Sequence, residues 1–299
     1  MEQTLQKHTR VDVADVLRGL AVMGIIILHS IEHFNFYSFP DTSEQSAWLN
    51  FTDKAVWDGL FFMFGGKAYA VFALLFGFSF FIMDDNQRMR GKDFRLRFCW
   101  RLILLFIIGN INAIFFTAEV LVMYSLLGFV LVLTCRLSDK KAFILACILM
   151  IQPIAIYHVI RAVCDASYVV PTIPTRALWG ATAEVQANGT FLETVKVNLW
   201  EGQLASLAWA WDNARIFQTS SLFILGMLMG RRRLLSEENT HVWGYILAGA
   251  LIAFFPLYGL GNMLPRYIES RNILTPLLLI ISSLYKFAFM LILVAGVVF

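Results

Sequence analysis

The feature that most constrains this chain is the recurrence of long apolar runs along its whole length. Many of them approach the ~20 residues that an α-helix needs to cross a bilayer. Hydrophobic residues make up 59% of the 299 residues and charged residues only 15%, whereas an average soluble protein carries about a quarter charged residues. We therefore exclude a water-soluble fold and predict an all-α, polytopic transmembrane helical bundle.

The hydropathy pattern predicts about eight spans. They cover residues 13–36, 58–83, 97–117, 119–135, 141–160, 214–230, 242–260 and 273–299. We divide the chain into an N-terminal five-helix unit (1–160), an extracytoplasmic segment (161–213) and a C-terminal three-helix unit (214–299). In the middle segment, FLETVKVNLWEGQLASLAWAW predicts an amphipathic helix at the outer interface or a lid packed on the spans. The last apolar run stops at Phe299 without a polar flank, so we expect a C-terminally truncated, incomplete last unit.

Clusters of basic residues orient the spans. They precede the first span and follow the second, fourth and sixth: Lys7, Arg10, Arg88, Arg90, Lys92, Arg95, Arg97, Arg101, Arg136, Lys140, Lys141, Arg231, Arg232 and Arg233. A cytoplasmic N-terminus puts all four clusters on the cytoplasmic side, as the positive-inside rule requires. We therefore predict that the N-terminus is cytoplasmic.

The first span carries an unusual set of polar residues: Asp15, Arg18, His29, Glu32 and His33. A charge at a helix centre costs about 2.5–3.5 kcal/mol on insertion scales and by default marks a functional site. Arg18 and His29 are separated by close to three helical turns, about 16 Å along the axis, and therefore share a face. Asp15 and His33 extend this polar stripe by one turn at either end. The alternative is an interfacial ion pair at one end and water-satisfied histidines at the other.

Further polar residues fall within later spans, namely Lys67, Asn112, Glu119 and Lys286. Antiparallel packing of successive spans places the first three at a depth similar to that of His29. Lys286 lies near the middle of the last span and needs a partner or an aqueous cavity. We predict a polar cluster in the outer half of the membrane.

The spacing of His29, Glu32 and His33 also matches the H-x-x-E-H pattern of inverzincin metalloproteases. A catalytic zinc needs a third protein ligand and an open position for water. Glu119 or Asp58 would have to supply that ligand, and no second motif points to either. We therefore expect no metal at this site.

Several stretches resemble membrane acyltransferases. VLRGLAVMGIIILH (16–29) looks like the arginine-plus-ten-plus-histidine signature of the acyltransferase-three type. Similar first helices occur in the wider superfamily that includes heparan-alpha-glucosaminide N-acetyltransferase. GKAYAVFALLFGFSF (66–80), RFCWRLILLFIIGNINAIFFTAEVLVMYSLLGF (97–129) and SSLFILGMLMGRRRLL (220–235) resemble, in order, blocks of the YeiB-type family of uncharacterised bacterial membrane proteins.

This resemblance implies an acyltransferase of the bacterial cytoplasmic (inner) membrane. It would move an acyl group from a cytoplasmic acyl-CoA-type donor to an extracytoplasmic glycan or lipid acceptor. His29 would be the catalytic base or acyl carrier, Arg18 would steady the donor, and Glu32 and His33 complete the expected catalytic group. The residues expected to bind substrate are Asp15, Lys67, Asn112, Glu119 and Lys286. The family often has histidine in place of Asn112 and aspartate in place of Glu119, so no catalytic role is carried over to the third span.

The expected partners are membrane lipids, the donor and the acceptor, with no nucleic acid, and a homodimer is compatible with the sequence. A transporter or proton-coupled permease is the main alternative. In that case Lys67, Lys286, Glu119 and His29 would form a polar relay. A third alternative is a non-catalytic membrane scaffold, in which the intramembrane charges serve assembly only.

Overall fold

The computed structural model describes residues 12–34, 43, 45–117 and 119–299, with the side chains of residues 32–34 outside the description. The described chain is built of helices without strands. The α-helices are α1 (Asp12–Phe34), α2 (Ala47–Phe64), α3 (Ala68–Arg88), α4 (Arg95–Ala113), α5 (Val120–Leu127), α6 (Phe129–Thr134), α7 (Asp139–Met150), α8 (Pro153–Cys164), α9 (Thr175–Asn188), α10 (Phe191–Val197), α11 (Gln203–Asp212), α12 (Arg215–Arg231), α13 (Thr240–Met263) and α14 (Arg271–Val298). A π-helical turn (Asn198–Gly202) joins α10 to α11, and 3₁₀ turns flank α13.

Each of the eight predicted apolar segments coincides with a helix or a consecutive helix pair. Among the described residues, five helical stretches are long and apolar enough to cross a membrane, with α2 and α3 counted as one. The pair α7–α8, bent by 49°, makes a sixth if it is counted as one broken span. The architecture is therefore compatible with a membrane protein.

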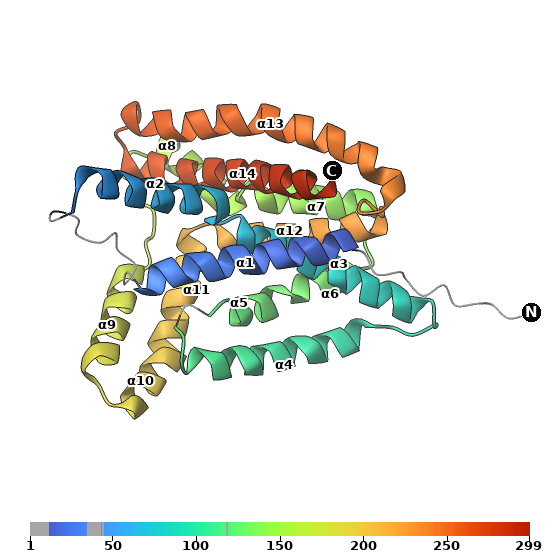
Figure 1. Ribbon diagram of the computed structural model, residues 1–299, viewed down its shortest axis with the longest axis horizontal. Coiled ribbons are helices and arrows are strands. Elements are labelled where there is room, and N and C mark those ends of the chain that lie inside the picture. Colours follow the sequence, from blue (N-terminus) through green and yellow to red (C-terminus); the bar gives the residue numbers. More distant parts are fainter. Residues whose placement is uncertain (1–11, 35–42, 44, 118) are drawn as a thin grey trace, which may run out of the picture.

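Helices α3 and α12 form the centre of the bundle (Figure 1). They run side by side in the same direction, and two glycines bring their backbones into contact. A Cβ built on Gly77 would lie 1.9 Å from the carbonyl oxygen of Phe223, and one on Gly226 would lie 1.8 Å from that of Leu74. Small residues of this kind let membrane helices approach closely. The side chain of Phe223, fully buried, stacks on Phe76 at a centroid distance of 4.6 Å.

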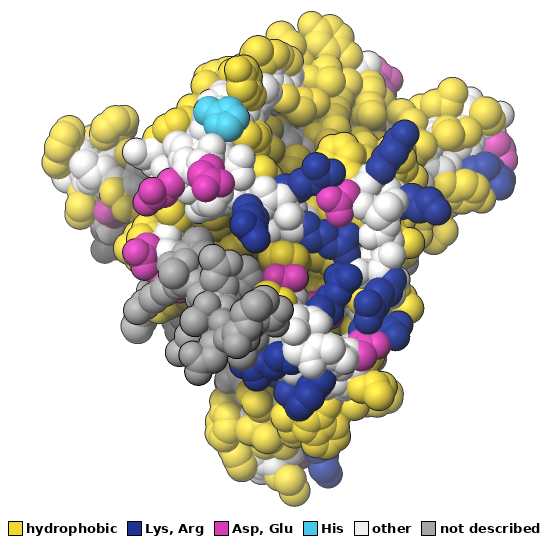
Figure 2. All heavy atoms as spheres, turned by 90° about the vertical axis from the view of Figure 1, so that its right-hand side faces the viewer, with side chains coloured by type: hydrophobic (Ala, Val, Ile, Leu, Met, Phe, Trp, Pro, Cys, Tyr) yellow, Lys and Arg dark blue, Asp and Glu magenta, His cyan; other side chains and the backbone are white. Residues whose placement is uncertain are grey.

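The basic clusters gather at one end of the bundle, called the basic end below. The start of α1, the α3–α4 and α6–α7 connections, the α12–α13 connection and the end of α14 all lie on the right of Figure 1. Figure 2 views this end directly and shows lysine and arginine side chains spread across it. Three clusters that are far apart in the sequence thus share one surface. The first cluster, Lys7 and Arg10, lies outside the described residues.

Helices α9, α10 and α11 lie at the opposite end, across the ends of the long helices (Figure 1). The Asn198 side chain, in the π-helical turn, donates a 2.9 Å hydrogen bond to the carbonyl oxygen of Ile114. A Cβ on Gly202 would lie 3.1 Å from Thr117 Cγ2. The segment therefore packs against the α4–α5 connection, while Trp200 remains largely exposed.

Candidate functional site

Three interruptions of helical backbone meet near the middle of the bundle. Gly66, between α2 and α3, has φ +78°, Gln152, between α7 and α8, has φ 59°, and Ala214, just before α12, has φ 61°. The Gln152 side-chain amide donates to the Ala214 carbonyl oxygen at 3.1 Å, which ties two of these breaks together. Left-handed conformations are costly for residues other than glycine and concentrate at functional sites. Inside a membrane, broken helices are tolerated where they are buried in protein or line a cavity.

Lys67 follows the first break and is 4% exposed. Its ammonium donates a hydrogen bond to the carbonyl oxygen of Phe62. It also lies 5.1 Å from the centre of the Phe62 ring and 5.2 Å from that of Phe289. Aromatic faces attract a cation but do not neutralise its charge.

Arg215 opens α12 beside the same break and is 8% exposed. Its guanidinium lies 4.0 Å from the centre of the Tyr69 ring, and its Nη1 lies 3.4 Å from the carbonyl oxygen of Gly66. Gly66 leaves room for this approach, since a Cβ there would lie 3.0 Å from Arg215 Nη2 and 3.4 Å from Lys286 Cδ. The Nε of Arg215 is buried and has no hydrogen-bond partner among the described residues.

Lys286, on α14, completes what we call the cation cluster: Lys67, Arg215 and Lys286. The charges of the other two members both act on Lys286. Within the described chain, no carboxylate lies within ion-pair distance of any member. Three buried or half-buried cations without a counter-charge carry a large electrostatic cost, which an anion bound among them would remove.

A network of neutral hydrogen bonds fixes the surroundings of the cation cluster. Tyr69 donates to Gln218 Oε1 at 2.6 Å, and Gln218 Nε2 donates to the Ser283 carbonyl oxygen at 3.0 Å. Gln152 Nε2 also donates to Ser283 Oγ at 3.1 Å. These bonds hold four separate helices or helix breaks together, and none of them involves Lys67, Arg215 or Lys286.

His29 lies on the far half of α1, with its ring 5.6 Å from that of Phe116 in an edge-to-face arrangement. Phe116 belongs to the α4–α5 connection, which is bridged by a hydrogen bond from Asn112 to Glu119. Glu119 also accepts from the Leu121 amide at 2.6 Å and so caps α5. Asn112 and Glu119 thus have a structural role that accounts for their polarity, beside the histidine expected to be catalytic.

Arg18 faces α3. It donates to Asp15 Oδ1 at 2.6 Å and to Ser79 Oγ at 2.8 Å. The arginine remains 38% exposed, so part of its guanidinium is free to meet solvent or a ligand. The Arg18–Asp15 ion pair, the alternative interpretation of these residues, is therefore present, and it is anchored to the central helix.

The predicted site residues thus fall into three groups along the bundle: Asp15 with Arg18, Lys67 with Lys286 in the cation cluster, and His29 with Asn112 and Glu119. The side chains of Glu32 and His33 lie outside the described residues. Where side chains are described, no group of three His, Cys, Asp or Glu residues is arranged to hold a metal.

Sequence reasoning missed Arg215 and Gln218. Both lie within the predicted span 214–230. The signal that could have revealed both was the polar run 218–221, which begins three residues after Arg215. All four residues of this run are buried, whereas polar residues that flank a span at the membrane interface are ordinarily exposed.

Two uncharacterised bacterial proteins are similar to part of this chain. Over 148 residues it is 34% identical to the uncharacterised protein YxaH of Bacillus subtilis (strain 168), a match that covers 46% of this chain and 36% of YxaH. Over 142 residues it is 25% identical to an uncharacterised 39.9 kDa protein in the amylase 3′ region of Bacillus acidopullulyticus, covering 48% of this chain and 39% of that protein. The matches thus span less than half the length of either relative. No protein-family model and no solved structure matches the chain.

Proposed function

We propose that this chain spans the bacterial inner membrane eight times, with its N-terminus and basic end in the cytoplasm. The crossings are the five long helical stretches, the bent pair α7–α8, the pair α5–α6 and α12. Helix α12 has 17 residues and is buried at the centre of the bundle. The single basic end supports this orientation, because the positive-inside rule places such clusters in the cytoplasm.

We further propose that the protein is an acyltransferase whose acceptor carries an anionic group bound by the cation cluster. We assign an anionic group to the acceptor because Lys67, Arg215 and Lys286 lie close together. Among the described residues, no carboxylate pairs with any of them. Along α12 and α14, the cluster lies about 18–24 Å from the basic end. This depth suits an acceptor such as a glycan or lipid headgroup that approaches from outside. The acyl chemistry rests on the resemblance of residues 16–29 to the arginine–histidine signature.

In the proposed reaction, a hydroxyl or amine of the acceptor attacks the carbonyl carbon of a cytoplasmic acyl-CoA-type thioester. A C–O or C–N bond forms and the C–S bond breaks. The proton lost by the acceptor passes through the imidazole of His29 to the leaving thiolate. Imidazole is suited to this role because it accepts and returns protons at neutral pH. Arg18, held by Asp15 and Ser79, would meet the donor's anionic groups nearer the cytoplasm.

The test of this proposal is acyl transfer by the purified protein in inverted vesicles, with labelled acetyl-CoA added outside. We expect His29→Ala to lower transfer into the lipid and glycan fractions by about 10²–10⁴-fold, because general acid–base catalysis has this magnitude. His241→Ala is the matched control, since His241 lies exposed at the basic end. In parallel, Arg18→Gln should weaken calorimetric acetyl-CoA binding about tenfold. Full activity of His29→Ala with a confirmed acceptor would refute the catalytic assignment.

An anion transporter is the second candidate, and the meeting of three helix breaks at the cation cluster favours it. Transporters place broken helices around charged substrates near the middle of the membrane. In that case proteoliposomes should exchange labelled organic anions across the bilayer without acyl turnover. Arg215→Gln should abolish the exchange, whereas His241→Gln should leave it intact. Exchange without transfer would replace the acyltransferase proposal.

A further inference from the structure

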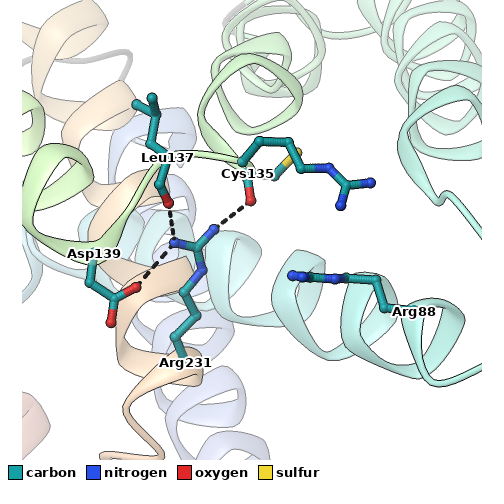
Figure 3. Close-up of a pocket in the computed structure, with 6 residues that line it drawn as sticks. Arg88, Cys135, Leu137, Asp139 and Arg231 are labelled. Carbon is teal, nitrogen blue, oxygen red and sulfur yellow. Dashed lines mark hydrogen bonds and ion pairs between the residues drawn. The ribbon is translucent and has the colours of Figure 1, made fainter.

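A second basic cavity, separate from the cation cluster, lies at the basic end. Its volume is about 300 Å³, and its lining residues are Arg88, Cys135, Arg136, Leu137, Asp139 and Arg231. They come from the end of α3, the α6–α7 connection and the end of α12. Figure 3 shows Arg88 and Arg231 extending from two helices toward the same space. Three arginines against one aspartate give the lining a net positive charge.

Arg231 builds this cavity. Its guanidinium donates to the carbonyl oxygens of Cys135 (2.6 Å) and Leu137 (2.9 Å), and it pairs with Asp139 at 3.2 Å (Figure 3). Asp139 is further paired with Arg232 at 2.7 Å. The acidic residue of the lining is therefore fully engaged, and Arg231 serves to clamp the α6–α7 connection onto α12.

The other two arginines have only weak protein partners. Arg88 Nη1 lies 3.9 Å from Asp84, and Arg136 Nη2 lies 3.4 Å from Asp93. Asp93 is already held by Arg95, whose hydrogen bonds keep the pKa of that carboxyl well below its usual range. In the described chain, neither Arg88 nor Arg136 makes a hydrogen bond to the protein at ordinary distance. Their planar donor sets match the oxygens of a phosphate group.

We propose that this cavity binds a phosphate group. Arg88 and Arg136 would hold the phosphate oxygens, and Arg231 would form part of the cavity wall. Anionic phospholipid headgroups and soluble phosphorylated molecules carry the same chemistry, and basic pockets at the cytoplasmic ends of membrane helices bind such headgroups. The cavity therefore restricts the possible ligands to molecules with a phosphate group that can enter from the basic end. This inference does not depend on acyl transfer.

The test uses the purified full chain and two probes. Inorganic pyrophosphate is titrated calorimetrically into the detergent-solubilised protein, and retention of phosphatidylglycerol over phosphatidylcholine is measured by native mass spectrometry. We expect Arg88→Gln and Arg136→Gln each to weaken binding of the recognised probe about tenfold, because each removes a charge-assisted hydrogen-bond donor set. Arg88→Lys should recover only part of the loss, since it restores the charge without the planar geometry.

Arg90→Gln is the matched control, since Arg90 lies exposed two residues from Arg88 and does not line the cavity. Arg90→Gln should therefore bind both probes like the unmodified protein. Arginine-dependent binding of pyrophosphate alone identifies a soluble ligand, and arginine-dependent retention of phosphatidylglycerol identifies a lipid. Binding of neither probe, or equal losses in Arg88→Gln and Arg90→Gln, would overturn the proposal.

Discussion

Replacing Lys286 with methionine is expected to stabilise the unliganded protein and, at the same time, to weaken its binding of anions. The substitution removes one of three like charges that meet without a carboxylate among the described residues, and it keeps an unbranched side chain of similar length. Relief of repulsion and of charge burial should raise the free energy of unfolding by on the order of 1 kcal/mol. Removal of a charged ligand contact should weaken anion affinity about tenfold or more.

Thermal unfolding in detergent, with and without decyl phosphate, measures both effects at once. Decyl phosphate is chosen because its alkyl chain favours entry of the anion among apolar helices. For the unmodified protein we expect Tm to rise with probe concentration by mass action. Lys286→Met should start at a higher Tm and respond less, and Lys286→Arg should respond nearly fully. Arg90→Gln should respond like the unmodified protein, because Arg90 is exposed and belongs to neither anion site. A lower starting Tm for Lys286→Met would mean that this lysine is a structural cation with a partner.

Opposite effects on stability and binding are the expected behaviour of a site whose charges are arranged for a ligand. A lysine kept for structure stabilises the empty protein, whereas a lysine kept for function costs stability until its ligand arrives. The same reasoning applies to Arg215, whose Nε is buried without a partner in the described chain. The two residues therefore belong to one binding unit, which predicts that their effects on anion affinity will be non-additive.

Much of the architecture could be predicted from the sequence because hydropathy and charge placement act locally. The apolar segments coincide with helices, and the basic clusters meet at one end because helices that alternate in direction bring every second connection together. Lys67 and Lys286 were found because a charge inside an apolar run stands out. Their closeness to Arg215 depends on the conformations of Gly66 and Ala214, which no periodicity encodes.

The polar stripe on α1 illustrates the limit of such reasoning. Helical periodicity correctly predicts that Arg18 and Asp15 interact, since they are three residues apart. It cannot predict that Ser79 of α3 would complete the contact, or that an Asn112–Glu119 hydrogen bond would bridge the turn beside His29. These contacts arise from packing between helices, and a single sequence without an alignment carries little information about it.

The largest loss of stability is expected from Gly226→Val, at the contact between α3 and α12. Even a Cβ at this position would lie 1.8 Å from the Leu74 carbonyl oxygen and 2.8 Å from its carbonyl carbon. Both neighbours are backbone atoms, so no side chain can rotate away and the two helices must separate. We expect destabilisation by about 3 kcal/mol or more, the upper range for overpacking. Thermal unfolding followed by fluorescence-detected size exclusion measures the loss.

Gly249→Val on α13 is the matched control, because nothing lies within 4 Å of a Cβ at that position. If both valine variants unfold at the same temperature, the close backbone contact is wrong.

Gly226→Ala tests whether the helix contact affects anion binding at the cation cluster. Alanine adds only one methyl group, so more of the protein should remain folded than with valine. Lys67 lies about 10 Å along α3 and Arg215 about 16 Å along α12 from this contact, and the contact fixes their relative depth. We therefore expect folded Gly226→Ala to bind decyl phosphate more weakly, although the substituted residue lies far from the ligand.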